Sequence, residues 1–184
     1  MSMIIENAKR LATEAHQGQK RKFGPERDFI CHPEEVAAKV ATLLYVTDED
    51  IAAAWLHDVI EDRAFRDGNE NEWHVRILEE CGMDVLRLVI ELTNTTHGPE
   101  WEGKTREEKR EEDQNRMRKI SKRAQQIKLV DRWCNMRDMA GAQHEFLRKY
   151  IRESRVLVEI CGMANLVMAF ELTNEINKVE AGLV

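Results

Sequence analysis

The chain has 184 residues, 42% of them hydrophobic, which is enough for one compact domain but too little for two complete enzymes. A formal net charge of −6 argues against a nucleic-acid-binding protein, because phosphate backbones are held mainly by clustered Lys and Arg. The first residues do not combine a basic stretch with an apolar one, and no run approaches the ~18 apolar residues of a membrane span. We therefore expect one domain over residues 1–184, a cytoplasmic location, and neither nucleic-acid nor membrane partners. Assembly of identical chains is left open.

Apolar residues recur at three- and four-residue spacing in most segments, and only three prolines interrupt them, which predicts an all-α fold. The stretches 63–71 and 94–104 are expected to be loops, because Gly, Asn and Pro favour turns. In chain order, we expect helices near residues 4–18, 33–45, 48–62, 72–80, 82–93, 105–126, 127–139 and 144–178.

Three local features refine this helical pattern. Pro33 suits the first turn of its helix, and Thr47 followed by Asp50 is typical of a helix N-cap, so a helix should begin there and run past His57. The charged run from Lys104 to Arg123 has few apolar residues, which favours a solvated helix face or a connector over a lid.

The four cysteines are widely spaced and form no C-x-x-C pair, so they predict neither a zinc knuckle nor a disulfide framework. Free cysteine is common in protein interiors. We interpret as reduced core thiols the residues Cys31, Cys81, Cys134 and Cys161.

The segment IAAAWLHDVIED, residues 51–62, concentrates polar groups on one side. On a continuous helix, His57, Glu61, Asp58 and Asp62 would fall at about 0°, 40°, 100° and 140°, while the apolar residues lie opposite. Three carboxylates and an imidazole beside a buried apolar face need a compensating charge or water. A divalent cation supplies that charge most simply.

A second polar stripe occurs in AQQIKLVDRWCNMRDM, residues 124–139. Lys128, Asp131, Asn135 and Asp138 share one helix face, while the apolar residues turn toward the core. An aspartate held in a core ion pair with Lys or Arg is the alternative reading of Asp131. The presence of a matching stripe in residues 51–62 favours a shared functional site.

These segments follow two others, AH-x-GQ-x-RK at residues 15–22 and the pair His32-Pro33. The four motifs in this order, over about residues 5–140, closely resemble the hydrolase domain of the RelA/SpoT alarmone enzymes, and most of all its small stand-alone forms. This resemblance implies a single helical domain of the HD superfamily. It also implies an enzyme that hydrolyses ppGpp or pppGpp at the 3′ position, releasing pyrophosphate and GDP or GTP, with a small nucleotide as its partner.

The resemblance further implies a role for each matching residue. One Mn2+ per chain would be held by His32, His57, Asp58 and Asp131, a ligand set that suits a first-row cation, although the metal's identity comes from the family. The other roles it implies are catalytic positioning of water by Glu61 and Asp62, and substrate binding by Arg21, Lys22, Asn135 and Arg137. Lys128, on the same face as Asp131, is expected to bind the substrate with Arg21 and Lys22 by balancing its negative charge.

Some features depart from the family pattern and leave alternatives open. The loop FGPERDFIC, residues 23–31, is about two residues longer than usual and carries Phe29 where a Pro-Tyr pair is expected. Another substrate, such as an adenosine alarmone or the 2′-phosphate of NADPH, therefore remains possible. On a continuous helix Arg137 would lie at about 240° from Asp131, so it could serve only if the helix ended or bent there.

Two further alternatives concern the reaction class. A general phosphodiesterase or nucleotidase of the HD superfamily with two metals would need His74 or His97 as extra ligands, and a nucleotide sensor without turnover would not need Glu61 and Asp62. We interpret His74, His97 and His144 as ordinary surface or loop histidines, and His16 as a packing residue or a residue behind the site.

Overall fold

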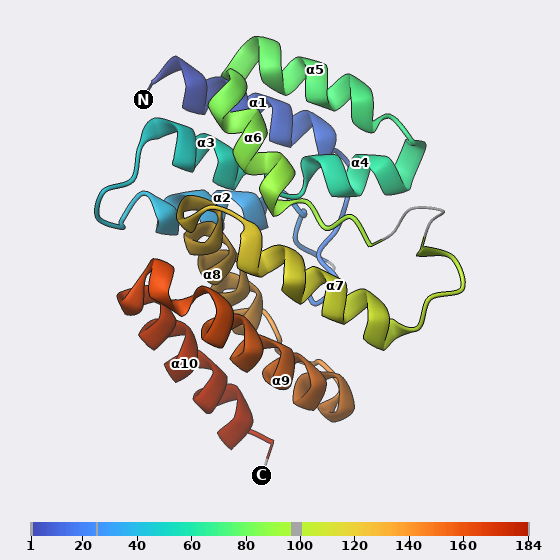
Figure 1. Ribbon diagram of the computed structural model, residues 1–184, viewed down its shortest axis with the longest axis vertical. Coiled ribbons are helices and arrows are strands. Elements are labelled where there is room, and N and C mark those ends of the chain that lie inside the picture. The colour runs from blue at the N-terminus through green and yellow to red at the C-terminus, as the bar shows by residue number, and fades with distance from the viewer. Residues whose placement is uncertain (1, 25, 97–100, 184) are drawn as a thin grey trace.

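The computed structural model describes residues 2–24, 26–96 and 101–183, and the regular elements in these ranges are helices apart from one isolated β-bridge between Lys20 and Asp28 (Figure 1). This confirms the all-α prediction. The helices are α1 (Met3–Ala15), α2 (Cys31–Val40), α3 (Asp48–Leu56), α4 (Val59–Asp67), α5 (Glu70–Cys81), α6 (Met83–Leu92), α7 (Arg106–Lys119), α8 (Lys122–Arg137), α9 (His144–Cys161), the short 3-10 helix η2 (Gly162–Ala164) and α10 (Leu166–Ala181).

The helices form two groups that meet around α2 and α8 (Figure 1). In the first group α1 packs on α3 and α5, and α3 packs on α6. In the second group α8 and α9 pack on α10, and α7 packs on α9. α2 contacts both α3 and α8, so the N-terminal end of α2 and one face of α8 lie at the junction.

One cluster of buried side chains runs through both groups. It includes Leu11 of α1, Leu56 of α3, Ile127 of α8 and Leu172 of α10, each fully buried. Burying a leucine or isoleucine of this kind stabilises the fold by roughly 1.5–3 kcal/mol. This core fixes the helices that carry the polar stripes. None of the helices in the described ranges is long and apolar enough to cross a membrane.

The predicted helix 48–62 is wrong in one respect, because it breaks at His57 and Asp58 into α3 and α4. The His57 ring Nδ1 lies 2.7 Å from the Ala54 carbonyl oxygen, which in a continuous helix would accept the N–H of Asp58. Asp58 has φ −100° and ψ −7°, and its carbonyl accepts the N–H of Asp62 at 2.9 Å. The His57 side chain thus competes with the backbone N–H of Asp58 for the Ala54 carbonyl, and the chain turns at His57 and Asp58.

Several other boundaries also differ from the predictions. The predicted loop 63–71 is helical through Asp67, and only Gly68, with φ 68°, and Asn69 connect α4 to α5. The predicted boundary at 126/127 lies instead at Ser121, whose hydroxyl caps α8 by accepting the Ala124 N–H at 3.2 Å. The predicted helix 33–45 ends at Val40, and part of the predicted loop 94–104 lies outside the described residues.

The predicted helix 144–178 is interrupted by η2 between α9 and α10. Gly162 permits a close approach there, since a Cβ at this position would lie 3.3 Å from the Cβ of Ala169. Asn165 then caps α10 by accepting the Met168 N–H at 3.0 Å. The predicted N-cap at Thr47 is confirmed, with the Asp50 side chain reaching back to the Thr47 N–H at 2.8 Å.

Candidate active site

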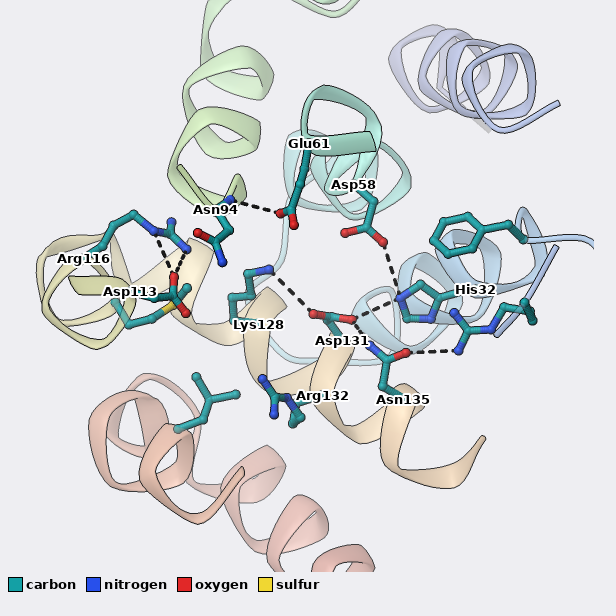
Figure 2. A pocket seen from close by; sticks show the side chains of 14 residues that line it. His32, Asp58, Glu61, Asn94, Asp113, Arg116, Lys128, Asp131, Arg132 and Asn135 are labelled. Atoms are coloured by element: carbon teal, nitrogen blue, oxygen red, sulfur yellow. Dashed lines mark hydrogen bonds and ion pairs between the residues drawn. The ribbon is translucent and has the colours of Figure 1, made fainter. Parts of the chain in front are cut away.

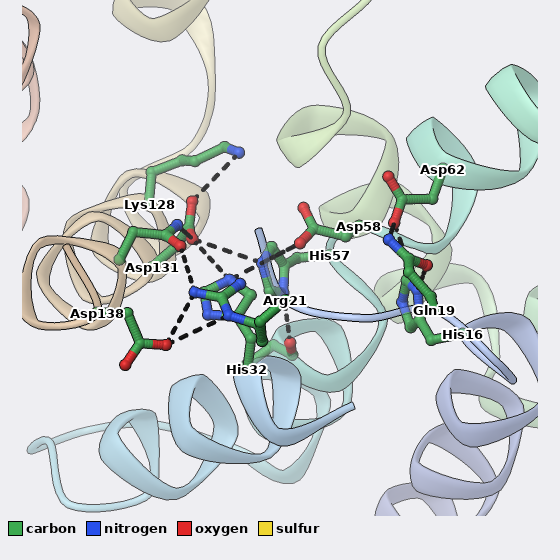
Figure 3. A network of polar contacts seen from close by, with 12 residues as sticks. His16, Gln19, Arg21, His32, His57, Asp58, Asp62, Lys128, Asp131 and Asp138 are labelled. Atoms are coloured by element: carbon green, nitrogen blue, oxygen red, sulfur yellow. Dashed lines mark hydrogen bonds and ion pairs between the residues drawn. The ribbon is translucent and has the colours of Figure 1, made fainter. Parts of the chain in front are cut away.

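Four side chains from three separate segments converge at the junction of the two helix groups (Figure 3). His32 comes from the first turn of α2, His57 and Asp58 from the break between α3 and α4, and Asp131 from α8. His57 Nε2 lies 3.1 Å from Asp58 Oδ2, and His32 Nε2 lies 3.1 Å from Asp131 Oδ1. The two cross distances, His32 Nε2 to Asp58 Oδ2 and His57 Nε2 to Asp131 Oδ1, are both 3.7 Å. The structure therefore brings together all four residues that the sequence singled out as metal ligands.

The state of the His57 ring fits a metal ligand. A carbonyl oxygen can only accept, so the contact between Nδ1 and the Ala54 carbonyl places the ring proton on Nδ1. Nε2 then faces the carboxylates of Asp58 and Asp131, 3.1 and 3.7 Å away, and once this nitrogen has no proton it presents a lone pair toward the site. An oriented imidazole with a free lone pair beside two carboxylates suits a divalent cation. The candidate ligand atoms of His32, His57 and Asp58 lie within 4.8 Å of one another.

The charges of the site point the same way. Burial disfavours the charged imidazole, but the carboxylates of Asp58 and Asp131 outweigh it and raise the pKa of His57 to about 10. Burial raises the pKa of the Asp131 carboxyl, but hydrogen bonds with His32 and His57 hold that pKa well below its usual range. Burial likewise raises the pKa of the Asp58 carboxyl, but interaction with His57 lowers it below its usual value, so two half-buried carboxylates stay ionised and the site attracts positive charge. A metal cation would displace a proton on binding.

Glu61 and Asp62, predicted together as water-positioning groups, lie in different surroundings. Glu61, in the first turn of α4, lines the cavity beside the four-residue cluster, and its Oε2 accepts the Asn94 N–H at 3.1 Å (Figure 2). Asp62 is not among the cavity-lining residues, and its Oδ2 accepts from Gln19 Nε2 at 2.7 Å. His16 lies behind this pair, with Nδ1 3.4 Å from the same Asp62 oxygen.

The cavity has a volume of about 330 Å3 and is lined by cations as well as by three members of the cluster, His32, Asp58 and Asp131 (Figure 2). Lys128 Nζ lies 3.7 Å from Asp131 Oδ2, and Asn135 Nδ2 donates to Asp131 Oδ1 at 2.6 Å. Arg21 donates to Asn135 at 3.0 Å and pairs with Asp138 at 3.0 Å, so the predicted stripe on α8 is linked to the loop before α2. Positive groups around ionised carboxylates suit a substrate that carries phosphate.

Two predicted substrate-binding residues lie elsewhere. Arg137 is the last residue of α8, and although the helix ends there, its exposed side chain stacks 4.4 Å above the Trp133 ring and does not line the cavity. Lys22 is exposed, and its Nζ lies 4.7 Å above the Phe146 ring, outside the same cavity. Each cation lies over a nearby aromatic ring and outside the cavity, so the geometry does not support the predicted binding of substrate by Arg137 and Lys22.

The sequence reasoning missed several lining residues, among them Asn94, Arg116 and Arg132. Arg132 follows Lys128 by four residues, so the spacing on α8 could have identified it. Arg116 stood within the charged run that was interpreted as a solvated face, and Asn94 acts through its backbone N–H, which leaves no sequence signal.

The remaining histidines are separated from the cluster as far as the structure describes them. Within the described ranges, His74 on α5 and His144 on α9 do not line the cavity, and they are not among the candidate metal ligands. His97, the other residue that a two-metal site would need, lies outside the described residues.

The sequence profile described as the HD domain matches residues 8–157, so the chain belongs to the HD-domain family, a class that binds a divalent metal. Within it, the chain belongs to the RelA/SpoT-type branch. The protein called guanosine-3′,5′-bis(diphosphate) 3′-pyrophosphohydrolase MESH1 from Xenopus tropicalis is 30% identical over 137 residues, which cover 74% of this chain and 69% of that one. The Drosophila melanogaster protein of the same name is 33% identical, covering 67% and 63%.

A longer relative matches this chain over only part of its own length. The guanosine-3′,5′-bis(diphosphate) 3′-pyrophosphohydrolase of Haemophilus influenzae is 30% identical over 90% of this chain, but that match covers only 23% of the relative. One solved structure, described as a metazoan ortholog of SpoT that hydrolyses ppGpp and plays a role in starvation responses, superposes with a TM-score of 0.81. It covers 100% of this chain and 98% of that one at 24% identity, which shows that the fold is shared.

Proposed function

We propose that the chain is a metal-dependent phosphohydrolase that cleaves ppGpp or pppGpp at the 3′ position, giving pyrophosphate and GDP or GTP. The observation that carries the proposal is the convergence of His32, His57, Asp58 and Asp131 beside a cavity that also holds Glu61 and several cations. The names of the MESH1 relatives support this substrate. We propose Mn2+ as the metal, one ion per chain, in a single cytoplasmic domain.

The four converging residues would hold the metal, and neighbouring groups orient two of them, His57 and Asp131. His57 offers the Nε2 lone pair that its bond to the Ala54 carbonyl leaves free. Asp131 is kept in place by the Asn135 amide. A bound divalent cation supplies Lewis acidity, which neutralises charge on the phosphoryl oxygens and makes water easier to deprotonate.

The side chains around the cluster supply the remaining chemistry. Glu61 accepts a proton from the water that attacks the phosphorus next to the 3′ oxygen, and the Asn94 N–H holds its carboxylate toward the cavity. The bond from that phosphorus to the 3′ oxygen breaks, the water oxygen leaves in pyrophosphate, and the ribose 3′ oxygen takes up a proton. Lys128 and Arg132 offset the charge of the phosphates.

We propose a different part for Asp62, which was predicted to act on the water together with Glu61. Its carboxylate is engaged by Gln19 and lies near His16, residues of the segment that follows α1. It therefore ties the first turn of α4, which also carries Glu61, to that segment. Arg21 has a similar part, because it joins the loop before α2 to Asn135 and Asp138 while its guanidinium lines the cavity.

The base of the nucleotide is the less constrained part of the proposal. Phe29 lines the cavity, and the Arg21 guanidinium lies 5.5 Å above its ring, in the segment that departs from the family pattern. An aromatic face and a guanidinium can bind adenine as well as guanine. Adenosine alarmones and NADPH are therefore the second candidate substrates.

Anion-exchange analysis of products tests the proposal. The protein is incubated with Mn2+ and a panel of ppGpp, pppGpp, the adenosine analogue and NADPH. We expect GDP and pyrophosphate from ppGpp, and none from the Asp131→Asn variant. Release of inorganic phosphate from NADPH at a higher kcat/KM would keep the reaction class and change the substrate. If no nucleotide were turned over, the proposed hydrolase activity would be refuted and a nucleotide sensor would be favoured.

A further inference from the structure

The first half of α10 is apolar on two opposite sides. Its inner side buries Met168 and Leu172 in the core, where α10 packs on α8 and α9. Its outer side presents Leu166 and Phe170, which lie one helical turn apart and are each 67% exposed. A helix that is apolar all round its axis is normally covered on every side. The outer side of α10 therefore has the pattern of a contact surface.

Two further apolar side chains extend this outer side. Val167 of α10 is 64% exposed, and Met163 of η2, which packs against α10, is 74% exposed. We call the four residues Met163, Leu166, Val167 and Phe170 the α10 face. Together they leave roughly 500 Å2 of apolar surface in water, an extent at which an exposed patch marks an interaction site. Figure 1 shows α10 at the edge of the second helix group, where such a surface is accessible.

The α10 face carries no charge with which to select a partner. Residues 160–170 include no charged residue, although 34% of the chain is charged. The four charged side chains of α10 are paired within the chain, Glu171 with Lys39 at 2.6 Å, Glu175 with Lys178 at 3.0 Å and Glu180 with Arg155 at 2.7 Å. α10 carries one lysine, whereas helices that lie on anionic membranes carry several cations beside their apolar side.

A second copy of the chain fits these properties. Two copies that each carry a net charge of −6 repel one another, so they can associate only where the facing surfaces have no unpaired charge. A twofold axis would bring two α10 faces together, with each residue meeting the same patch of the other copy. The four side chains of each copy would then bury roughly 1,000 Å2 in total, which reaches the lower limit of specific interfaces.

We propose that the α10 face is a dimerisation surface, and that its partner is the α10 face of a second copy of this chain. For an interface of this size we expect a dissociation constant of about 1–50 µM. In the described ranges α10 contributes no residue to the cavity beside the candidate metal ligands, so that cavity stays open in the dimer. The inference is therefore independent of the proposed reaction.

The test measures the mass of the protein by analytical ultracentrifugation at about 1–200 µM. The wild type should rise from the 21.5 kDa of one chain toward twice that mass. Leu166→Glu with Phe170→Glu should stay at one chain, because a dimer would bring four like charges together. The matched control, Val75→Glu with Met83→Glu, adds the same charge at exposed apolar positions of α5 and α6, at the opposite end of the view in Figure 1, and should dimerise like the wild type.

Two further variants identify the partner and guard against misfolding. Leu166→Gln with Phe170→Gln adds no charge and should weaken the dimer at least about tenfold, with an unchanged circular dichroism spectrum. Leu166→Lys with Phe170→Lys should be monomeric alone but should dimerise when mixed with the glutamate variant, because opposite charges then face each other.

Several outcomes would overturn the proposal. A wild type that stays at the mass of one chain at about 200 µM would exclude the dimer. Dimerisation of the glutamate variant, or dissociation of the control, would place the interface elsewhere. A mixture of the lysine and glutamate variants that stays monomeric would refute the face-to-face arrangement. Sedimentation of a monomeric wild type with phosphatidylserine vesicles, lost in the glutamine variant, would assign the α10 face to a membrane.

Discussion

Replacing Glu61 with glutamine tests how the cavity handles protons. The Asn94 N–H reaches Glu61 Oε2 at 3.1 Å, and a glutamine oxygen can accept the same bond, so the side chain should keep its place. What is lost is the ability to take a proton from water. Loss of a general base typically costs about 10²–10⁴ in rate, and we expect turnover of ppGpp to fall by about 10²–10³, or about 2.7–4 kcal/mol.

Asp62→Asn is the matched comparison for that experiment. An asparagine can still accept from Gln19, so the tie between α4 and the segment after α1 should survive. We expect kcat to fall at least about tenfold less than in Glu61→Gln. Single-turnover kinetics with Mn2+, together with metal content, measures both variants. Equal losses would refute the division of roles, and release of the metal from Glu61→Gln would make Glu61 a ligand.

Three further predictions use other parts of the structure. Arg21→Ala should raise KM for the nucleotide and also lower the free energy of unfolding by about 1–3 kcal/mol, because Asn135 and Asp138 lose a partner. Steady-state kinetics and denaturant unfolding measure the two effects. An unchanged free energy of unfolding would contradict a structural link from Arg21 to these two residues. Burial raises the pKa of Cys81 to about 11, of Cys134 to about 12 and of Cys161 to about 11, so these thiols stay protonated at pH 8. A thiol reagent should therefore modify the partly exposed Cys31 first, with the other three reacting only as pH rises toward those values or on unfolding; fast reaction of four thiols would be inconsistent with the fold. The kcat/KM for ppGpp should exceed that for NADPH at least about tenfold, because a 2′-phosphate offers one phosphate where ppGpp offers two, and the reverse order in parallel assays would reassign the substrate.

The sequence was most informative where periodicity and chemistry agreed. The stripe Lys128, Asp131, Asn135 and Asp138 could be predicted from three- and four-residue spacing, because α8 is continuous to Arg137 and Asp138 follows directly as its C-cap. The helix through His57 could not be predicted correctly in the same way, since its break depends on a side chain that competes for the Ala54 carbonyl. A prediction from periodicity assumes an unbroken helix and cannot detect a hydrogen bond between a side chain and the helix backbone.

The site residues show the same division. His32, His57, Asp58 and Asp131 could be assembled from motif order, since the residue types themselves carry the chemistry. Arg137 and Lys22 match motifs, yet aromatic rings nearby hold their charges, and only the packing of Trp133 and Phe146 reveals it.

The charged run gave the largest difference between sequence and structure. Its low apolar content suggested a solvated face, because composition does not distinguish which side of a helix each charge occupies. Only the packing of α7 on α9 places Arg106 and Lys109 in a cavity and Glu111 outside it. Plotting the charged residues by their position around α7 would have shown cations and carboxylates on different sides of the helix. It would not have shown that the cationic side faces a cavity.

Metal stoichiometry by elemental analysis tests the central claim most directly. We predict one divalent metal per chain in the wild type and in His74→Ala, whose side chain lies on α5 away from the cluster. His32→Ala and Asp131→Asn should each lose it, because each removes one of four ligands. Two metals per chain, with one lost in His74→Ala, or full retention in both ligand variants, would contradict the account.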